Sequence, residues 1–181
     1  NRPWVTAMDV ILEILRRLTV KGGVGKILEY GGPGVENLSV TERATVTNMG
    51  AELGATTSIF PSDKRTRHFL KAQGRDAAWI GLHADKNAEY AETIEIDLNS
   101  IEPMIAQPHS PDNVIPVREL AGTKIHQVCI GSCTNSSYQI MKSVSSIMKG
   151  NSVAEGVNLL INPGSKQVYE MLSRKGFIAD M

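Results

Sequence analysis

The stretch IHQVCIGSCTNSSYQIMKSVSSIMKG, residues 125–150, decides the fold of this chain. Its first six residues predict a strand, GSCTNSS predicts a turn, and YQIMKSVSSIMKG has apolar residues at helical spacing. A second strand, VNLLI at 157–161, precedes a turn and a helix over 162–176, with Ser165 as the expected N-cap and Gly176 as the stop. A strand–helix–strand–helix order is typical of right-handed crossover connections, so we expect an α/β fold built on parallel strands.

The chain before residue 116 also predicts alternating helices and strands. Thr6 and Asp9 can form a capping box at the start of one amphipathic helix. Ser39 and Glu42 can form a second box, for a helix expected to end near Leu53. The other elements expected here are strands at 26–30, 55–60 and 93–98, and a helix at about 63–73 with Ser62 as its cap and Gly74 as its stop.

Residues 102–117, EPMIAQPHSPDNVIPV, are rich in proline and show neither the strand period nor the helix period. We interpret them as a connector shaped by its prolines and by His109, with a domain boundary near Pro116. Residues 1–116 should form a three-layer α/β unit with a mixed or parallel sheet. Residues 117–181 should open a second α/β domain that stays incomplete, and we expect the chain to be an internal piece of a longer protein because it lacks a start methionine.

The composition argues against several classes of protein. The chain has 181 residues, of which 41% are hydrophobic and 21% charged, and Lys+Arg and Asp+Glu each number 19. This balance is ordinary for a globular protein and offers no basic excess for binding nucleic acid. No apolar run reaches the length of a membrane span. Cys129 and Cys133 are the only cysteines, which favours a reducing, cytoplasmic compartment over a secreted disulfide scaffold.

The glycines of KGGVGK, residues 21–26, raise the question of a phosphate-binding loop. Such a loop needs a strand before it, a helix after it, and a Ser or Thr after the lysine to hold magnesium. Here a helix is expected before the glycines, the strand-like ILEY follows them, and Ile27 occupies the hydroxyl position. We therefore reject nucleotide hydrolysis and expect a tight turn between a helix and a strand.

The turn GSCTNSS carries the strongest chemical signal. Cys133 should lie at the opening of a helix, where unpaired N–H groups and the helix dipole favour the thiolate that attacks electrophiles or binds metals. Ser132 and Asn135 in the same turn can cap the helix or donate hydrogen bonds to a sulfide or a carboxylate. The alternative for Cys133 is a small buried thiol, and Cys129 is expected to be plain core. One or two thiols fall short of the three or four that an iron–sulfur cluster needs.

IGSCTNSS, together with KGGVGKILEYGGPGVENLSVTERATVTNMGAELGATTSIFPSD at 21–63, resembles the aconitase family of [4Fe–4S] hydro-lyases. The likeness runs in order from WVTAMDVIL to NPGSKQVYEML and covers a middle stretch of the full enzymes. It implies a cluster held by three cysteines, whose open iron acts as a Lewis acid on a hydroxy-polycarboxylate substrate. It also implies a serine base that comes from another domain.

By this resemblance, Cys133 matches the first cluster cysteine, Asn48 an asparagine near the cluster, and Glu52 a glutamate of the active site. Positions 48 and 52 are four apart on the expected second helix, so both side chains should share one face, and the alternative is a solvated helix face. The family's other two cluster cysteines, its substrate-binding arginines and its serine base have no match in this chain. The resemblance therefore implies that the chain alone carries no complete cluster and is inactive.

For the parent protein, the resemblance implies interconversion of citrate and isocitrate through cis-aconitate, a reaction of the tricarboxylic acid cycle. Dehydration of isopropylmalate or homocitrate is the alternative within the family, because the residues that discriminate these substrates lie mostly outside the matched stretch. A non-catalytic binding or scaffold module is the alternative from another class. The expected partners are the small-molecule substrate and the remaining domains of the same enzyme, rather than a membrane or a nucleic acid.

Overall fold

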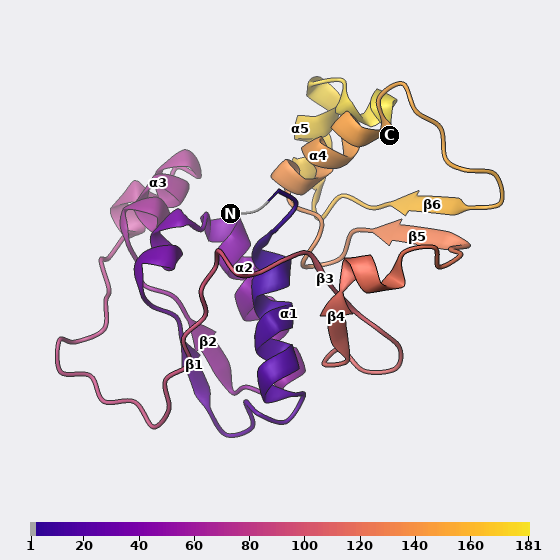
Figure 1. Ribbon diagram of the computed structural model, residues 1–181. Helices are drawn as coiled ribbons and strands as arrows, with labels where there is room; N and C mark the ends of the chain where they lie inside the picture. Colours follow the sequence, from indigo (N-terminus) through magenta and orange to yellow (C-terminus); the bar gives the residue numbers. More distant parts are fainter. Residues whose placement is uncertain (1–2) are drawn as a thin grey trace. The chain divides into compact units, whose positions relative to one another are not determined.

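The computed structural model describes residues 3–181 of the chain. The chain divides into two compact units, each described by itself: unit 1 extends to Glu119 and unit 2 comprises Leu120–Met181. This division lies close to Pro116, and the domain limits 1–116 and 117–181 stay a prediction. Both units combine helices with short strands, which confirms the expected α/β class (Figure 1). Among the helices of residues 3–181, none combines the length and the apolar character needed to cross a bilayer.

In unit 1 the strands pair two by two rather than joining one wide sheet. The elements follow in the order α1 (Ala7–Leu18), β1 (Ile27–Glu29), α2 (Val40–Met49), β2 (Thr57–Ile59), α3 (Lys64–Ala72), β3 (Met104–Ala106) and β4 (Val114–Pro116). Strands β1 and β2 are parallel, whereas β3 and β4 form an antiparallel pair. In the part of the chain that the structure describes, every sheet has two strands, so the single mixed or parallel sheet expected for unit 1 is wrong, and its three-layer arrangement stays a prediction.

Helix α1 is the centre of unit 1. Its expected capping box is confirmed, because the backbone N–H of Thr6 donates to Asp9 Oδ2 at 2.7 Å. The apolar core gathers around this helix and includes Ile11 and Leu15 of α1, Val46 of α2, Leu53, and Val114 of β4, all buried. Burying a Leu, Ile or Val side chain stabilises a fold by about 1.5–3 kcal/mol. This cluster is therefore what holds α2 and the β3–β4 pair against α1.

Residues 102–117 contribute structure to the fold and are more than a connector, since they contain β3 and β4. Two carboxylates fasten this hairpin to the ends of α1. The backbone N–H of Met104 donates to Asp9 Oδ1 at 2.7 Å, and the backbone N–H of Val20 donates to Asp112 Oδ2 at 3.0 Å. Strands of three residues are too short to show a period in the sequence, which is why the hairpin escaped prediction.

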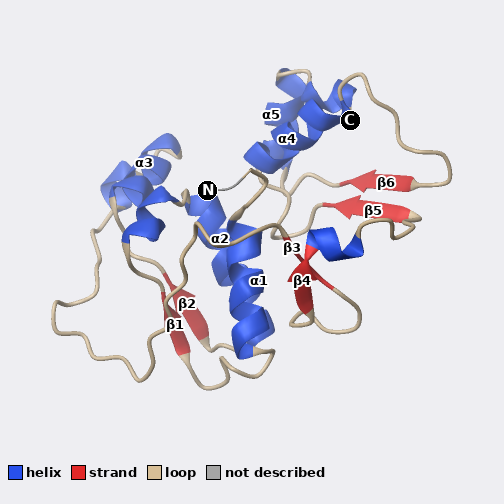
Figure 2. Ribbon diagram, viewed as in Figure 1, coloured by secondary structure: helices blue, strands red, loops and turns tan. Residues whose placement is uncertain are grey.

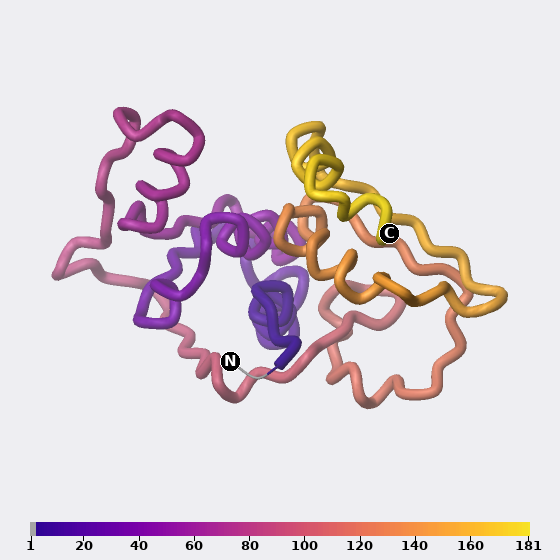
Figure 3. The backbone as a smooth tube through the Cα atoms, turned by 90° about the horizontal axis from the view of Figure 1, so that it is seen from above, coloured from indigo at the N-terminus to yellow at the C-terminus, as the bar shows by residue number. Residues whose placement is uncertain are grey.

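Two other expectations for unit 1 are wrong. The alternating stretch TIEIDL at 93–98 is not a strand, and the whole run from Trp79 to β3 contains no helix or strand (Figure 2). Figure 3 traces this run as an extended, open path. The cap of α3 is Asp63 rather than Ser62, because Asp63 Oδ1 accepts hydrogen bonds from the backbone N–H groups of Arg65 at 2.9 Å and Thr66 at 3.1 Å.

The glycines of KGGVGK form the turn from α1 to β1 that the sequence predicts. The backbone N–H of Gly23 donates to the carbonyl oxygen of Leu53 at 2.9 Å, and a Cβ on Gly23 would lie 2.9 Å from that same oxygen. A side chain at position 23 would therefore push the turn away from the end of the Gly50–Leu53 3-10 turn. The glycine serves close packing of the backbone.

Unit 2 has the strand–helix–strand–helix order predicted from its sequence. Its elements are β5 (Gln127–Ile130), α4 (Tyr138–Met148), β6 (Asn158–Ile161) and α5 (Lys166–Arg174), followed by a 3-10 turn at Phe177–Asp180. Strands β5 and β6 are parallel, with Cys129 opposite Leu160. The expected cap of α5 is confirmed, since the backbone N–H of Val168 donates to Ser165 Oγ at 3.2 Å. Gly176, with φ of 77°, follows the helix as the expected stop.

Candidate functional site

The candidate site is the turn that follows β5, residues 131–137. Because β5 and β6 are parallel, this turn and the loop after β6 leave the sheet at its carboxyl edge, where α/β proteins bind ligands. The backbone N–H of Asn162 donates to the carbonyl oxygen of Ile130 at 2.8 Å, and the backbone N–H of Gly164 donates to the carbonyl oxygen of Ser136 at 3.2 Å. These bonds hold the two loops side by side.

Two glycines make this close approach possible. A Cβ on Gly131 would lie 2.9 Å from the carbonyl oxygen of Asn162, and a Cβ on Gly164 would lie 2.9 Å from Ser136 Cβ. Real Cβ atoms essentially never approach other heavy atoms this closely. The turn and its neighbouring loop are therefore built around positions that only glycine fits.

Cys133 lies in this turn and its side chain is exposed. Helix α4 begins only at Tyr138, and its cap is Ser137, whose Oγ accepts a hydrogen bond from the backbone N–H of Ile140 at 3.4 Å. The thiol thus precedes the N-cap by four residues. The expectation that Cys133 lies at the opening of the helix is therefore wrong, because the helix is capped by Ser137 and not by a residue beside the cysteine. Exposure also excludes the buried-thiol alternative and leaves the sulfur open to a metal or an electrophile.

The polar residues grouped with Cys133 in the sequence share its turn in the structure. Ser132 has a left-handed backbone, with φ of 67°, and its hydroxyl lies 3.4 Å from that of Thr134. The hydroxyl of Ser136 donates to the carbonyl oxygen of Ser132 and closes the turn. Asn135 is half-buried in the same turn. Ser132, Cys133 and Asn135 are therefore neighbours, and their action on a ligand stays a prediction.

Cys129 is exposed, so its expected place in the core is wrong. It projects from the more exposed face of β5, and its partner across the sheet, Leu160, is 54% exposed. Val128 and Ile130 occupy the less exposed positions of the strand. The sequence shows that alternate residues of β5 point to opposite faces of the sheet, but it does not show which of the two faces the helices cover.

Asn48 and Glu52 lie at the end of α2 and just beyond it. The α-helix ends at Met49, and Glu52 belongs to the 3-10 turn Gly50–Leu53. The two residues therefore do not share the single α-helix on which their spacing argument rested, since a 3-10 turn has three residues per turn. Both side chains are exposed. They belong to unit 1, whereas Cys133 belongs to unit 2, and their joint action stays a prediction.

A metal centre would have to draw ligands from outside residues 3–181. In that range no three His, Cys, Asp or Glu side chains lie close enough together to hold a metal ion. The exposed thiol of Cys133 is a soft ligand of the kind that iron–sulfur clusters use. The described residues therefore fit such a cluster as the source of one ligand, and they do not supply the complete set.

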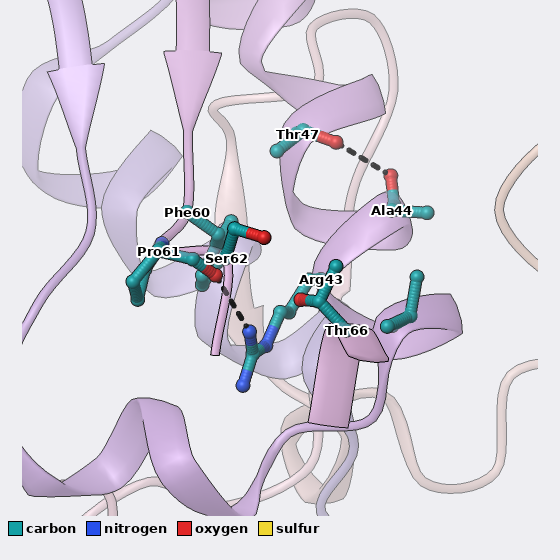
Figure 4. Close-up of a pocket in the computed structure, with 8 residues that line it drawn as sticks. Arg43, Ala44, Thr47, Phe60, Pro61, Ser62 and Thr66 are labelled. Atoms are coloured by element: carbon teal, nitrogen blue, oxygen red, sulfur yellow. Dashed lines mark hydrogen bonds between the residues drawn. The ribbon is translucent and has the colours of Figure 1, made fainter. Parts of the chain in front are cut away.

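Sequence reasoning missed Arg43, a cation buried beneath α2 with 4% of its surface exposed. Its guanidinium donates from Nε to Leu38 O at 3.1 Å, from Nη1 to Pro61 O at 3.0 Å, and from Nη2 to Val35 O at 3.1 Å and Asp63 Oδ2 at 2.6 Å. Figure 4 shows the bond to Pro61. The sequence held a signal for this burial, because Arg43 precedes the buried Val46 by three residues and so shares its face of the helix.

The hydrogen bond from Arg43 dominates the acidity of Asp63. It holds the pKa of that carboxyl at about 2, against an ordinary value of 3.8, and the backbone N–H groups of Thr66 and Arg65 act in the same direction. Partial burial of Asp63 opposes the shift. The pair is therefore ionised at neutral pH.

A pocket of about 270 Å³ opens beside this ion pair (Figure 4). It is lined by Val40, Arg43, Ala44 and Thr47 of α2 and by Phe60, Pro61, Ser62 and Thr66. Thr47 does not point a free donor into it, since its hydroxyl donates to the carbonyl oxygen of Ala44 at 3.1 Å. The guanidinium is already bonded to the protein, and no carboxylate lines the pocket. We therefore place the candidate chemistry at the turn of Cys133 and not in this pocket.

Comparison with known proteins covers the whole chain. A model of the aconitase family (aconitate hydratase) matches residues 1–124 and 118–181. The chain is 42% identical to 3-isopropylmalate dehydratase large subunit 2 of Archaeoglobus fulgidus, over 96% of the chain and 42% of that protein. It is also 42% identical to the mitochondrial aconitate hydratase of Schizosaccharomyces pombe, over 98% of the chain and 25% of that protein. The mitochondrial homocitrate dehydratase of Saccharomyces cerevisiae is 42% identical too, over 97% of the chain and 25% of its own length. The chain thus spans less than half the length of these relatives.

Proposed function

Because the chain belongs to the aconitase family, we propose that it is part of a hydro-lyase that interconverts citrate and isocitrate through cis-aconitate. The three relatives described above are named as a hydratase and two dehydratases, and all of them therefore remove or add water. The reaction class is supported by every one of these names. The choice of citrate rests on the family model, which is described by aconitate hydratase.

Cys133 is the residue that we expect to bind the cofactor. When bound, an iron–sulfur cluster supplies a Lewis-acid iron that polarises the hydroxyl of the substrate. Cys133 would contribute one thiolate to it from the exposed turn after β5. The remaining thiolates would come from other parts of the parent protein, so we expect the chain alone to be inactive.

The polar neighbours of Cys133 would orient the bound groups. The amide of Asn135 and the hydroxyl of Ser132 can donate hydrogen bonds, and these bonds would be strongest to an anion such as a substrate carboxylate or a cluster sulfide. Both residues lie in the turn that holds the thiol. Their roles would be to fix the orientation of the acid and to exclude loosely bound water.

Asn48 and Glu52 would act from the end of α2. An exposed amide can bind a substrate carboxylate or hydroxyl, and an exposed carboxylate can accept the proton that accompanies loss of water. Glu52 lies in a 3-10 turn whose other residues include the buried Leu53, so the backbone that carries the carboxylate is anchored in the core.

The observation that carries the proposal is the exposure of Cys133 in a turn at the carboxyl edge of a parallel sheet. To test it, the full-length protein that contains this chain should be purified without oxygen in three forms: unchanged, Cys133→Ser and Cys129→Ser. Iron content and hydration of cis-aconitate, followed by loss of its ultraviolet absorbance, are then measured. We expect Cys133→Ser to lose both. Cys129→Ser is the matched control, because it also removes an exposed thiol, and it should keep both.

Dehydration of 3-isopropylmalate is the second candidate. It is supported by the Archaeoglobus fulgidus relative, to which the chain is as similar, at 42% identity, as to the aconitate hydratase. Parallel assays with citrate, 3-isopropylmalate and homocitrate decide between the substrates by the ratio of kcat/KM values. Full-length protein that takes up no iron when iron and sulfide are supplied, and that turns over none of the three, would support a non-catalytic binding role instead.

A further inference from the structure

The buried guanidinium of Arg43 lies on the helix that carries a proposed active-site residue. Arg43 precedes Asn48 by five residues on α2 and has 4% of its surface exposed. Four hydrogen bonds tie it to three parts of unit 1. Two acceptors, Val35 and Leu38, lie in or next to the Pro33–Asn37 turn. The others are Pro61, shortly after β2, and Asp63, the N-cap of α3. These bonds fix the rotation of α2 as well as its distance from the neighbouring elements.

Apolar packing holds α2 against α1, and the hydrogen bonds of Arg43 add direction to that hold. The fully buried apolar side chain of α2 is Val46, and the helix also presents Ala44 and Asn48 to solvent. Hydrophobic contacts are non-directional, so they fix the distance of α2 from α1 more firmly than its rotation about its own axis. The fork of Arg43 is directional and planar, and it resists that rotation.

Asp63 extends this connection to the next helix. Its Oδ2 accepts the 2.6 Å bond from Arg43, while its Oδ1 accepts hydrogen bonds from Arg65 and Thr66 at the first turn of α3. One carboxylate thus links the position of α2 to that of α3. The side chains of Arg43 and Asp63 are 5% and 19% exposed, so water screens this pair far less than the exposed Arg67–Asp76 pair of α3.

We infer that Arg43 is a positioning residue for Asn48: its fork fixes the placement of α2, and with it the orientation of the Asn48 amide toward the substrate. This inference rests on the proposed function, since it needs Asn48 to act on the substrate or the cluster. Lysine cannot replace Arg43, because a single ammonium cannot reach the carbonyl groups of Val35, Leu38 and Pro61 and the carboxylate of Asp63 in one plane. Displacement of a catalytic group by about 1 Å can lower a rate by ~100-fold.

A buried ion pair that only stabilised the fold would look the same in a static structure. The two roles differ in how their loss combines with loss of Asn48. If Arg43 acts through the Asn48 amide, then removing the amide leaves nothing for Arg43 to orient, and the two substitutions are not additive. If Arg43 serves stability alone, the activity of each folded molecule is unaffected by Arg43→Lys.

The test is a double-mutant cycle in the full-length protein with Arg43→Lys, Asn48→Ala and both together. The measured quantities are kcat and KM per folded molecule for hydration of cis-aconitate, at a temperature where circular dichroism shows every variant folded. We expect Arg43→Lys to lower kcat by about tenfold, Asn48→Ala to lower it by more, and the double variant to match Asn48→Ala. Fold-losses that multiply would overturn the positioning role, as would an unchanged kcat in either single variant.

Two further variants keep the inference testable if Arg43→Lys fails to fold. Asp63→Asn retains a good N-cap for α3 but removes the charge that Arg43 pairs with, so it should lower kcat in the same direction by a smaller factor. Arg67→Lys is the matched control, because it alters an Arg–Asp pair with Asp76 that is 55% and 40% exposed. It should leave kcat and KM unchanged.

Amide hydrogen exchange supplies a readout that does not depend on activity. Arg43→Lys should speed exchange at residues 46–50 of the 181-residue chain at least tenfold, and Arg67→Lys should not. Unchanged protection at 46–50 overturns the positioning role whatever the activity. Absence of turnover in the unmodified full-length protein would instead count against the proposed function, and the exchange result would still show whether Arg43 holds the end of α2 in place.

Discussion

The carboxylate of Asp9 accepts a 2.7 Å hydrogen bond from the backbone N–H of Met104, which lies 95 residues later in the chain. The same carboxylate accepts the backbone N–H of Thr6 and so caps α1. Asp9 is 5% exposed. One side chain therefore both starts the central helix of unit 1 and fastens the β3–β4 hairpin to it.

Replacement of Asp9 should destabilise the chain more than loss of an ordinary cap. We expect Asp9→Ala to lower the free energy of unfolding by ~2–3 kcal/mol, because it breaks the capping box of α1 and leaves the partly buried N–H of Met104 without its acceptor. Urea denaturation of the 181-residue chain measures the difference. Glu42→Ala is the matched control, since Glu42 holds the same position in the capping box of α2 but is exposed. It should cost ~0.5–1 kcal/mol, and equal losses in the two variants would contradict the fastening role.

The Arg43–Asp63 pair predicts a pH dependence of stability in the acid range. Folding lowers the pKa of Asp63 from 3.8 to about 2, so the pair stabilises the fold at every pH above the unfolded value, and that stabilisation is lost as pH falls from about 4 to about 2. Its size near neutral pH should be ~1–2 kcal/mol, after allowance for the partly exposed carboxyl. The measurement is the difference in unfolding free energy between the unmodified chain and Asp63→Asn from pH 7 to pH 2.5.

Other carboxylates also contribute to the acid dependence of stability, and Glu13 is one whose pKa is lowered by its hydrogen bond to Arg16. Because both proteins share those groups, their effects cancel in the difference. The gap between the unmodified chain and Asp63→Asn should narrow steadily below pH 4. A gap that stays constant down to pH 2.5 would show that Asp63 does not titrate with folding.

Both cysteines should react with a thiol reagent in the folded chain. Cys129 and Cys133 are each exposed, so an aromatic disulfide reagent without denaturant should label two thiols per chain. Cys129→Ser and Cys133→Ser should each leave one reactive thiol. In the iron-loaded full-length protein, Cys133 should be protected and Cys129 should stay reactive. A single reactive thiol in the unmodified chain would refute the exposed position of one of them.

The two loops at the carboxyl edge of unit 2 should tolerate no side chain at Gly131. A Cβ there would meet the carbonyl oxygen of Asn162 at 2.9 Å, and the residue has φ of 158°. We expect Gly131→Ala to destabilise the chain by ~1–3 kcal/mol. Gly31→Ala is the control, since a Cβ on Gly31 meets nothing within 4 Å. It should lie within about 0.5 kcal/mol of the unmodified chain in thermal or urea unfolding.

The sequence predicts an element correctly where the residues that determine it are close together in the chain. The boxes formed by Thr6 with Asp9 and by Ser39 with Glu42 are confirmed, because a cap is decided within three residues. The parallel pair β5–β6 was also predicted, since a helix must connect its strands. In these cases the determining contacts lie within one element or one crossover.

The errors arose where distant contacts decide the structure. TIEIDL at 93–98 alternates like a strand, but no other strand pairs with it. The hairpin of β3 and β4 depends instead on hydrogen bonds from Met104 to Asp9 and from Val20 to Asp112, across 95 and 92 residues. No local pattern records such bonds.

The candidate site divides in the same way. The sequence predicted the turn of Cys133 with Ser132 and Asn135, because the order of strand, turn and helix is local. The exposure of Cys129 was not predicted, since an alternating strand does not reveal which face its helices cover. Arg43 was missed because a cation is expected at the surface unless its acceptors are known, and three of those acceptors are backbone carbonyl groups.

The divided carboxylate of Asp63 limits how the chain can vary over evolution. One of its oxygens caps a helix and the other neutralises a buried cation, so substitution at position 63 affects both at once. Serine or threonine at position 63 could still cap α3 but would leave the guanidinium of Arg43 buried without a counter-ion. Related sequences should therefore change the two positions as a pair, and those with an uncharged residue at 43 should be free to carry an uncharged cap at 63.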